Sequence, residues 1–295
     1  MAKVGFIGLG IMGAPMAVHL IKGGHELFTN THGETPKSVV EAGVTECANA
    51  AEVARNADII ITMVPDTPHV EDVLFGENGV IEGLSKGKIV VDMSSISPVA
   101  TKDFAKRIVE AGGEYVDAPV SGGEVGAKAA SLTIMCGGKE EIFNKVKPLF
   151  ELMGKNITLV GGYGDGQITK VANQIIVALN IEAVGEALLL ASKAGANPAK
   201  VREALRGGLA DSRILEVHGE RMIKRTFDPG FRIELHQKDL NLALTTARQI
   251  GVALPNTANA QELFNTCAAN GGSAWDHSAL VRALEIMANF EIKEL

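Results

Sequence analysis

The sequence has 295 residues, 46% of them hydrophobic, which is enough for the cores of one large or two moderate domains. Its net charge of −7 and the absence of a basic tract argue against nucleic-acid and acidic-membrane partners. The three cysteines, Cys47, Cys136 and Cys267, lack the paired spacing of a disulfide framework or zinc site. With no charged-then-apolar leader and no apolar run approaching a membrane span, we expect a cytoplasmic protein without a membrane partner.

Residues 1 to about 160 alternate between apolar, β-branched runs and amphipathic stretches such as Ala48–Asn56 and Pro98–Ala111. Strands are predicted at Val4–Ile7, Glu26–Thr29, Asp58–Val64, Lys88–Met93, Glu114–Asp117, Leu132–Cys136 and Ile157–Val160. This alternation predicts an α/β fold with a mostly parallel, doubly wound sheet covered by helices on both faces. It leaves open whether the later strands run antiparallel.

The first predicted strand runs directly into a turn with glycines at a characteristic spacing. The turn reads Gly8-Leu9-Gly10-Ile11-Met12-Gly13, and a helical apolar pattern follows it. In a dinucleotide-binding turn the first glycine makes the tight turn, the second admits the pyrophosphate, and the third lets the helix pack on the strand. An ordinary strand-to-helix turn is the alternative, but strand, turn and helix together favour a Rossmann-type nucleotide site.

The glycine-rich stretch 161–166 separates this half from a helical half. A run of roughly 28 residues, Gln167 to Ala194, has no proline and one glycine, and it predicts a long helix leading into a second domain. Further helices are predicted at Pro198–Arg206, Ser212–Lys224, Leu235–Ile250, Pro255–Asn270 and Ser278–Asn289. We therefore expect a nucleotide-binding domain at 1–162 and an all-helical substrate and oligomerisation domain at 163–295. The apolar faces of the helical half favour a homo-oligomer, a dimer or tetramer.

The carboxyl ends of the strands are the expected ligand-binding edge of the sheet. The third strand ends in Met63, Val64 and Pro65, where a nicotinamide ribose would lie. The fourth is followed by Ser94, Ser95 and Ser97, which can either cap the next helix or contact the cofactor. We favour Ser95 for the contact.

The end of the second strand bears on cofactor choice. An NAD-specific site would carry a carboxylate here to hold the ribose hydroxyls, whereas this chain has Asn30 and Thr31. No arginine is present to hold a 2′-phosphate. The pair is compatible with NADP or NAD, and we expect NADPH or dual use.

The segment Asp117–Gly123 follows the fifth strand and contains Ser121, Gly122 and Gly123. A serine with two glycines presents a hydroxyl and successive backbone N–H groups, a concavity that suits a carboxylate. A flexible surface turn is the alternative.

Lys170 follows the glycine-rich stretch, in the first turns of the long helix, and helical spacing places Asn173 and Gln174 beside it. The helix dipole lowers the pKa of a lysine here, as burial would, and this would suit it to pass a proton to or from a substrate oxygen. A solvated surface lysine is the alternative. Lys238 and Asp239 follow an aromatic-containing turn and are either site-lining residues or a charged helix face. His69, His218, His236 and His277 show no metal-ligand spacing, so no metal is expected.

Four motifs in this order resemble the β-hydroxyacid dehydrogenase family, which includes 3-hydroxyisobutyrate and 6-phosphogluconate dehydrogenases. They are Gly5–Gly13, Asp117–Gly123, Gly166–Lys170 and Lys238–Leu240, and the likeness covers essentially the whole chain. It implies an active site between the two domains, with Lys170 as the catalytic lysine and Ser121, Gly122 and Gly123 binding substrate. It also implies that Lys238 reaches the cofactor, with Phe231 and Asp239 nearby.

Many relatives carry asparagine four residues after the lysine, whereas this chain has Gln174 there and Asn173 before it. Which amide assists the lysine is left open. The resemblance implies NAD(P)H-dependent reduction of a small semialdehyde acid, and segments Asn173–Asn180 and Pro229–Ile233 favour tartronate semialdehyde, giving glycerate. The alternatives are 3-hydroxyisobutyrate, glyoxylate or succinic semialdehyde as substrate, or a dinucleotide-binding sensor without catalysis.

Overall fold

The computed structural model describes residues 1–293 and contains two compact units, Met1–Lys170 and Val171–Leu295. The division falls inside one continuous helix, α9 (Asp165–Lys193). Each unit is packed around buried hydrophobic residues of its own.

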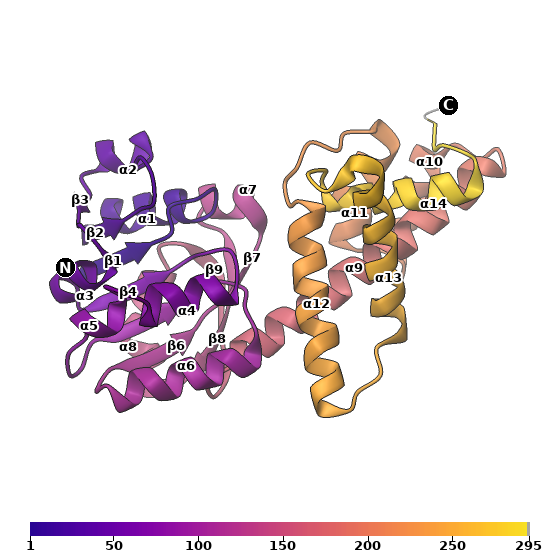
Figure 1. The fold of residues 1–295 in the computed structure, drawn as a ribbon. Helices are drawn as coiled ribbons and strands as arrows, with labels where there is room; N and C mark the ends of the chain where they lie inside the picture. Colours follow the sequence, from indigo (N-terminus) through magenta and orange to yellow (C-terminus); the bar gives the residue numbers. More distant parts are fainter. Residues whose placement is uncertain (294–295) are drawn as a thin grey trace. The chain divides into compact units, whose positions relative to one another are not determined.

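The first unit is built around a nine-stranded mixed sheet (Figure 1). Its strand order is β3-β2-β1-β4-β5-β6-β8-β7, and β9 pairs with β8. The strands β1 to β6 are parallel, and β8 is antiparallel to both β6 and β7. The strands are β1 (Lys3–Ile7), β2 (Glu26–Asn30), β3 (Thr45–Glu46), β4 (Ile59–Thr62), β5 (Ile89–Asp92), β6 (Glu114–Asp117), β7 (Val120–Ser121), β8 (Leu132–Gly138) and β9 (Gly154–Gly161).

Alternate residues of the strands enter two different cores, one on each face of the sheet. Phe6, Ile61 and Val91 face the core that α1 (Gly13–Lys22) and α8 (Glu140–Phe150) cover. Ile60 and Val90 face the other core, beneath α3 (Ala50–Asn56), α4 (Thr67–Phe75) and α6 (Pro98–Glu110). Three short helices complete the unit: α2 (Lys37–Ala42), α5 (Val80–Gly83) and α7 (Gly123–Lys128). The doubly wound architecture predicted from the alternation of strands and helices is confirmed.

The strand prediction misses two short elements and shortens a third. Strands β3 and β7 have two residues each, too few to show a periodic pattern. Strand β9 extends beyond the predicted 157–160 at both ends, because the added residues are the exposed polar Lys155 and Asn156 and the glycines Gly154 and Gly161, which carry no apolar signal. The open question of strand direction is answered by β8, which runs against β6.

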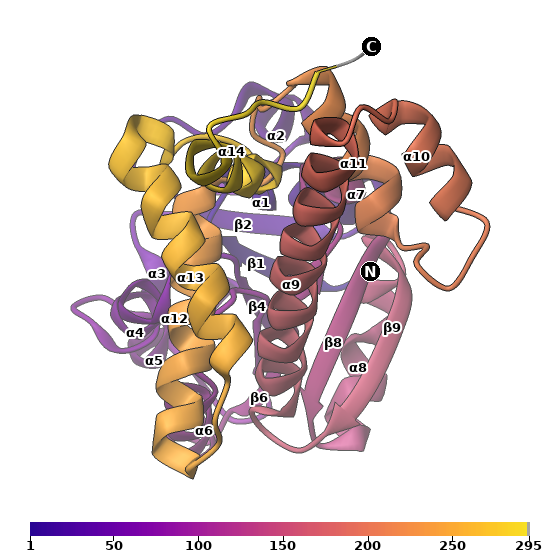
Figure 2. The same cartoon turned by 90° about the vertical axis from the view of Figure 1, so that its right-hand side faces the viewer.

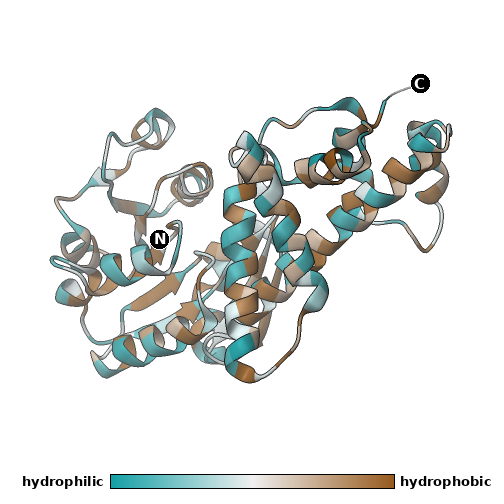
Figure 3. Cartoon of the chain, turned by 45° about the vertical axis from the view of Figure 1, so that its right-hand side comes forward, coloured by the Kyte–Doolittle hydropathy of each residue, from teal (hydrophilic) through white to brown (hydrophobic). Residues whose placement is uncertain are grey.

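The second unit consists of helices, as predicted. After α9 come α10 (Pro198–Leu205), α11 (Arg213–Lys224), α12 (Ile233–Ile250), α13 (Pro255–Cys267), the short helices η1 (Ala268–Gly272) and η2 (His277–Leu280), and α14 (Val281–Ala288). Helices α12 and α13 lie side by side (Figures 1 and 2). Hydrophobic and hydrophilic residues alternate along these helices (Figure 3), and the hydrophobic ones form the core of the unit.

Helix α9 corrects one expectation from the sequence. It contains an 18-residue window of mean hydropathy 1.8, so its length and composition alone would allow it to span a membrane. Within the second unit, however, its residues Ala178, Ile181 and Leu188 are fully buried in the core that it shares with α11 to α14. Because 33% of that window is buried in the structure, burial accounts for only part of its apolar composition.

Candidate active site

The three glycines of the turn between β1 and α1 differ in what they leave room for. A Cβ on Gly8 would lie 2.2 Å from the Met63 carbonyl oxygen, and its φ of +103° also favours glycine. A Cβ on Gly13 would lie 1.9 Å from the Gly8 oxygen. A Cβ on Gly10 would meet nothing within 4 Å, so no packing requirement of the described residues accounts for this glycine. The open space beside Gly10 fits a ligand that approaches the backbone.

The N-terminus of α1 is suited to an anion. No side chain caps it, and its first turn contains no acidic residue. The first backbone N–H groups of a helix have no partner within the helix, and together with the helix dipole they attract phosphate. Of the other turn residues, Leu9 is buried, Met12 half-buried and Ile11 63% exposed. The turn therefore has the features that a pyrophosphate needs.

At the end of β2, Asn30 is half-buried and anchored to the backbone. Its Nδ2 donates to the Cys47 and Ala48 carbonyl oxygens at 3.2 and 3.1 Å. The Thr31 hydroxyl donates to the Gly33 carbonyl at 2.6 Å. Because both side chains are neutral and donate to backbone oxygens, they offer acceptor oxygens to a ribose rather than a charge to a phosphate.

The residues that follow β4 and β5 are joined by a buried serine. Ser94 is fully buried, and its Oγ accepts from the Val64 backbone N–H at 3.0 Å. Ser97, not Ser94 or Ser95, caps α6 by accepting from the Ala100 N–H. Ser97 is therefore the serine that caps this helix. Ser95, between Ser94 and Ser97 in the sequence, is half-buried. On the β4 side, Met63 and Val64 are half-buried and Pro65 is exposed.

The segment after β6 is more ordered than a flexible surface turn. Ser121 is half-buried and pairs in register with Thr133 as part of β7. Gly122 and Gly123 have φ values of +132° and +60°, which explains why glycine occupies both positions, and α7 begins at Gly123. The predicted serine hydroxyl is therefore held at the start of a tight strand-to-helix junction.

Two carboxylates are buried at the ends of neighbouring strands. Asp92 accepts from the Thr62 hydroxyl at 2.8 Å and from Ser94 N at 3.0 Å. Asp117 accepts from the backbone N–H groups of Gly164 and Gln167 at 2.8 and 2.9 Å. Burial raises the pKa of Asp92 to about 6 and that of Asp117 to about 7, although these hydrogen bonds act in the opposite direction.

Lys170 is the sixth residue of α9 and is only 8% exposed. The alternative of a solvated surface lysine is therefore wrong. The next turn of the same helix carries Asn173 and Gln174, and Asn173 Nδ2 donates to Gln174 Oε1 at 2.7 Å.

In the second unit, four predicted site residues form one polar chain. Gln174 Nε2 donates to Asp239 Oδ2 at 2.6 Å, and Lys238 Nζ lies 3.0 Å from Asp239 Oδ1. Gln174 and Asp239 are buried, and Lys238 has an exposed side-chain fraction of 18%. The chain thus runs Asn173–Gln174–Asp239–Lys238, and the alternative reading of the Lys238–Asp239 pair as a solvated helix face is wrong.

The turn that contains Phe231 is held by Asp276. Asp276 Oδ2 accepts from Gly230 N and Phe231 N at 2.9 and 3.1 Å, and Arg221 pairs with the same oxygen at 3.0 Å. The other oxygen accepts from the Ser278 hydroxyl at 2.6 Å. Asp276 is only 1% exposed, so this carboxylate fixes the turn from inside the unit.

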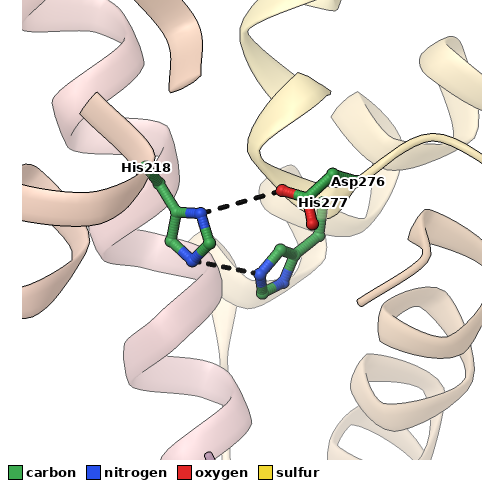
Figure 4. Close-up of side chains that lie close together, drawn as sticks. All are labelled: His218, Asp276 and His277. Carbon is green, nitrogen blue, oxygen red and sulfur yellow. Dashed lines mark hydrogen bonds and ion pairs between the residues drawn. The ribbon is translucent and has the colours of Figure 1, made fainter. Parts of the chain in front are cut away.

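Three histidines continue from this point into the core (Figure 4 shows the outer two with Asp276). His236 Nε2 lies 3.1 Å from the Gln174 carbonyl oxygen, which can only accept, so this nitrogen carries the proton. If each ring is neutral, His236 Nδ1 accepts from His277 Nδ1 at 2.9 Å, and His277 Nε2 accepts from His218 Nε2 at 3.2 Å. One carbonyl therefore sets the tautomers of all three rings.

The outer end of this chain agrees with neutral rings. His218 Nδ1 is left without a proton and lies 3.7 Å from Asp276 Oδ1, beyond hydrogen-bond distance. Burial lowers the pKa of His218, against the attraction of Asp276 and together with the repulsion of Arg221.

Sequence spacing did not reveal that His218, Asp276 and His277 lie together, because 58 residues separate the first two along the chain. Their ligand atoms lie within 4.8 Å of one another, a grouping that could hold a metal ion. Both oxygens of Asp276 already accept hydrogen bonds, however, and the Arg221 cation lies beside them. The arrangement therefore suits a hydrogen-bonded chain better than a cation.

Comparison with known proteins covers nearly the whole chain. Residues 3–162 match the family model for the NAD-binding domain of 6-phosphogluconate dehydrogenase, and residues 164–284 match that for NAD-binding of NADP-dependent 3-hydroxyisobutyrate dehydrogenase. The chain is 66% identical to 2-hydroxy-3-oxopropionate reductase of Escherichia coli, covering 98% of this chain and 99% of that protein. It is 32% identical to 3-hydroxyisobutyrate dehydrogenase of Pseudomonas aeruginosa, covering 90% and 92%. The structure of 3-hydroxyisobutyrate dehydrogenase of Mycobacterium tuberculosis with L-serine is similar at a TM-score of 0.89 and 30% identity, covering 96% and 99%.

Proposed function

The chain belongs to the β-hydroxyacid dehydrogenase family of NAD(P)-dependent oxidoreductases, and on that premise we propose that it reduces 2-hydroxy-3-oxopropanoate (tartronate semialdehyde) to glycerate. The observation that carries this proposal is the 66% identity, over 98% of the chain, to the Escherichia coli reductase of that substrate. The identity to the 3-hydroxyisobutyrate dehydrogenase of Pseudomonas aeruginosa is half as high, so 3-hydroxyisobutyrate is the less favoured substrate.

The proposed cofactor residues fit a dinucleotide. Gly10 opens onto free space, the N-terminus of α1 lacks an acidic residue, and Asn30 and Thr31 present neutral oxygens to the adenine ribose. Met63, Val64, Pro65 and Ser95 would border the nicotinamide ribose, and Lys238 would contact the cofactor as well. Because position 30 carries neither a carboxylate nor a cation, we propose that the enzyme uses both NADPH and NADH.

A bound nicotinamide would supply the hydride for the aldehyde carbon. Lys170, as its ammonium form, donates a hydrogen bond to the carbonyl oxygen and then gives that oxygen a proton as negative charge develops on it. The neutral amine left on Lys170 regains its proton from solvent. Lys170 is only 8% exposed, and a hydrogen bond from a charged group is stronger where little water surrounds it.

The remaining predicted residues hold the substrate. Ser121, Gly122 and Gly123 would bind the carboxylate, and Phe231 and Asp239 are the other residues that we propose for substrate binding. Gln174 lies four residues after Lys170 on α9, and we propose that it orients Lys170 while Asn173 contacts the substrate hydroxyl. No step of this mechanism requires a metal.

We further propose a homo-oligomer that works in the cytoplasm. Helices α9 and α14 pack together at Gly185, and both keep large apolar side chains exposed: Ile176 (61%), Leu190 (74%) and Met287 (65%). Burying such side chains against a second copy is favourable. The three cysteines are unpaired, which fits a reducing compartment. Light scattering after size-exclusion chromatography tests the assembly, and a monomeric mass would contradict it.

The function is tested by following NADH and NADPH oxidation at 340 nm with tartronate semialdehyde, glyoxylate, succinic semialdehyde and methylmalonate semialdehyde. We expect the highest kcat/KM with tartronate semialdehyde. A higher value with another aldehyde acid would reassign the substrate. Tight cofactor binding with no turnover of any of them would favour the sensor alternative.

A further inference from the structure

Gln167, the third residue of α9, bonds to both neighbours of Ser95. Its side chain is fully buried, with Nε2 donating to the Ser94 carbonyl at 2.7 Å and Oε1 accepting from the Ile96 N–H at 3.1 Å. A glutamine side-chain amide has a donor nitrogen and an acceptor oxygen on the same carbon, and here each of them makes a hydrogen bond. The loop after β5 is therefore held on both sides of the residue proposed to contact the cofactor.

The backbone of Gln167 is fixed from a second strand. Its N–H donates to Asp117 Oδ2 at 2.9 Å, and Asp117 Oδ1 accepts from Gly164 N at 2.8 Å. Asp117 is the last residue of β6 and is fully buried. A carboxylate that accepts the first N–H groups of a helix fixes where that helix begins.

Two glycines allow α9 to start this close to the sheet. A Cβ on Gly166 would lie 2.7 Å from Asp117 Oδ2 and 2.5 Å from the Met135 oxygen, and a Cβ on Gly137 would lie 2.7 Å from Asp117 Oδ1. Neither position has room for a side chain. The contact between Asp117 and the helix start is thus a close-packed one.

The same network reaches the loop after β4, because Ser94 Oγ accepts from Val64 N at 3.0 Å. The ends of β4, β5 and β6 are therefore connected to the first turn of α9 through Ser94, Gln167 and Asp117. Lys170 lies three residues after Gln167, about one turn further along that helix.

We propose that Gln167 is a positioning residue that holds Ser95 and Val64 in register with the first turn of α9, which carries Lys170. The expected effect of Gln167 on turnover rests on the proposed function. The expected effect of Gln167 on cofactor affinity requires only that the chain binds a dinucleotide. Loss of the amide releases the Ser94–Ile96 loop while the core packing of the strands is kept.

The first test is Gln167→Met, which keeps length and removes both hydrogen bonds. We expect the dissociation constant for NADPH, measured by fluorescence titration without substrate, to rise about tenfold or more, because two buried partners lose their bonds. We also expect kcat with the semialdehyde to fall. Gln261→Met is the matched control, since Gln261 is 6% exposed and lies on α13. Equal cofactor affinity in the two variants would overturn the proposal.

A second variant separates positioning from general damage. In Gln167→Glu a protonated carboxyl can donate to the Ser94 oxygen and accept from Ile96 N, whereas the ionised form has no donor. We expect near wild-type cofactor affinity at acidic pH and weaker affinity as pH rises, relative to wild type at each pH. Other titratable groups lie on the elements packed against this side chain: Asp92, Asp117 and Lys170. Comparing the variant with wild type at the same pH corrects the cofactor affinity for their titration.

An affinity ratio that does not change with pH would contradict the assignment. Because binding is measured without substrate, failure of the proposed function shows up separately, as absent turnover in the wild type.

Discussion

Gln174 Nε2 donates to Asp239 Oδ2 at 2.6 Å, and this buried bond joins α9 to α12 in the helical unit. The other oxygen of Asp239 pairs with Lys238 at 3.0 Å, while Asn173 donates to Gln174 Oε1. These four residues are therefore linked by two hydrogen bonds and one ion pair. Removing any one of them leaves a polar partner in a largely buried position.

The effects of Gln174→Ala and Asp239→Ala on kcat/KM should therefore be strongly non-additive. Either single change already breaks the shared bond, so we expect a coupling free energy of about 1 kcal/mol or more in a double-mutant cycle. Asn259→Ala, which removes an exposed bond to Glu182, combined with Asp239→Ala provides the additive control. Additivity of the Gln174 and Asp239 changes would mean that the two side chains act independently.

The three glycines of the β1–α1 turn should separate stability from binding. Gly8→Ala and Gly13→Ala place a Cβ 2.2 and 1.9 Å from backbone oxygens, so both should lower the melting temperature markedly. In Gly10→Ala the added Cβ meets no atom of the protein within 4 Å, so this variant should keep the wild-type melting temperature while binding the dinucleotide more weakly. Differential scanning fluorimetry with and without NADPH measures both quantities. Unchanged NADPH affinity in Gly10→Ala would place the pyrophosphate elsewhere.

The histidine chain makes a prediction about proton positions. At neutral pH, ¹⁵N NMR should find His236 protonated at Nε2, His277 at Nδ1 and His218 at Nε2, because the Gln174 carbonyl sets the direction of the chain. An Nε2 proton on His277 would show that the chain runs the other way or is broken. His25 outside this cluster gives a reference signal for an imidazole in the other unit.

The buried carboxylate of Asp92 should make stability depend on pH. Its folded-state pKa of about 6 lies above the ordinary value of 3.8, so the folded state holds this proton more tightly than the unfolded state does. The resulting contribution to the free energy of unfolding is fully present below about pH 4 and is lost as pH rises through 6. The shift corresponds to about 3 kcal/mol. Asp92→Asn should therefore lose less unfolding free energy than wild type between pH 4.5 and 7.5 in urea titrations. A wild-type slope no steeper than that of the variant would contradict this assignment.

Much of the sheet could be predicted because its strands are buried on both faces. Runs such as Ile59–Thr62 and Ile89–Asp92 are entirely buried and read as continuous apolar segments. The two-residue strands β3 and β7 have no such pattern, and their pairing depends on β2 and β8 being in place. Long apolar strands are thus visible in sequence, whereas short edge strands follow from their neighbours.

The candidate site shows the same division. The glycine turn and Lys170 can be predicted because their spacing along one strand or helix carries the signal. The cluster of Asp276 with the histidines cannot, because His218, His236 and His277 come from three separate elements and meet only when the helices pack. The role of Gln167 was also hidden, since its partners Ser94 and Ile96 lie more than 70 residues away.

Lys170→Ala tests most directly whether Lys170 protonates the substrate oxygen. NADPH affinity by fluorescence titration should stay near wild type, while kcat with tartronate semialdehyde should fall by about 10²–10⁴-fold. Lys86→Ala, at an exposed position, serves as the control. Wild-type turnover in Lys170→Ala would contradict the mechanism.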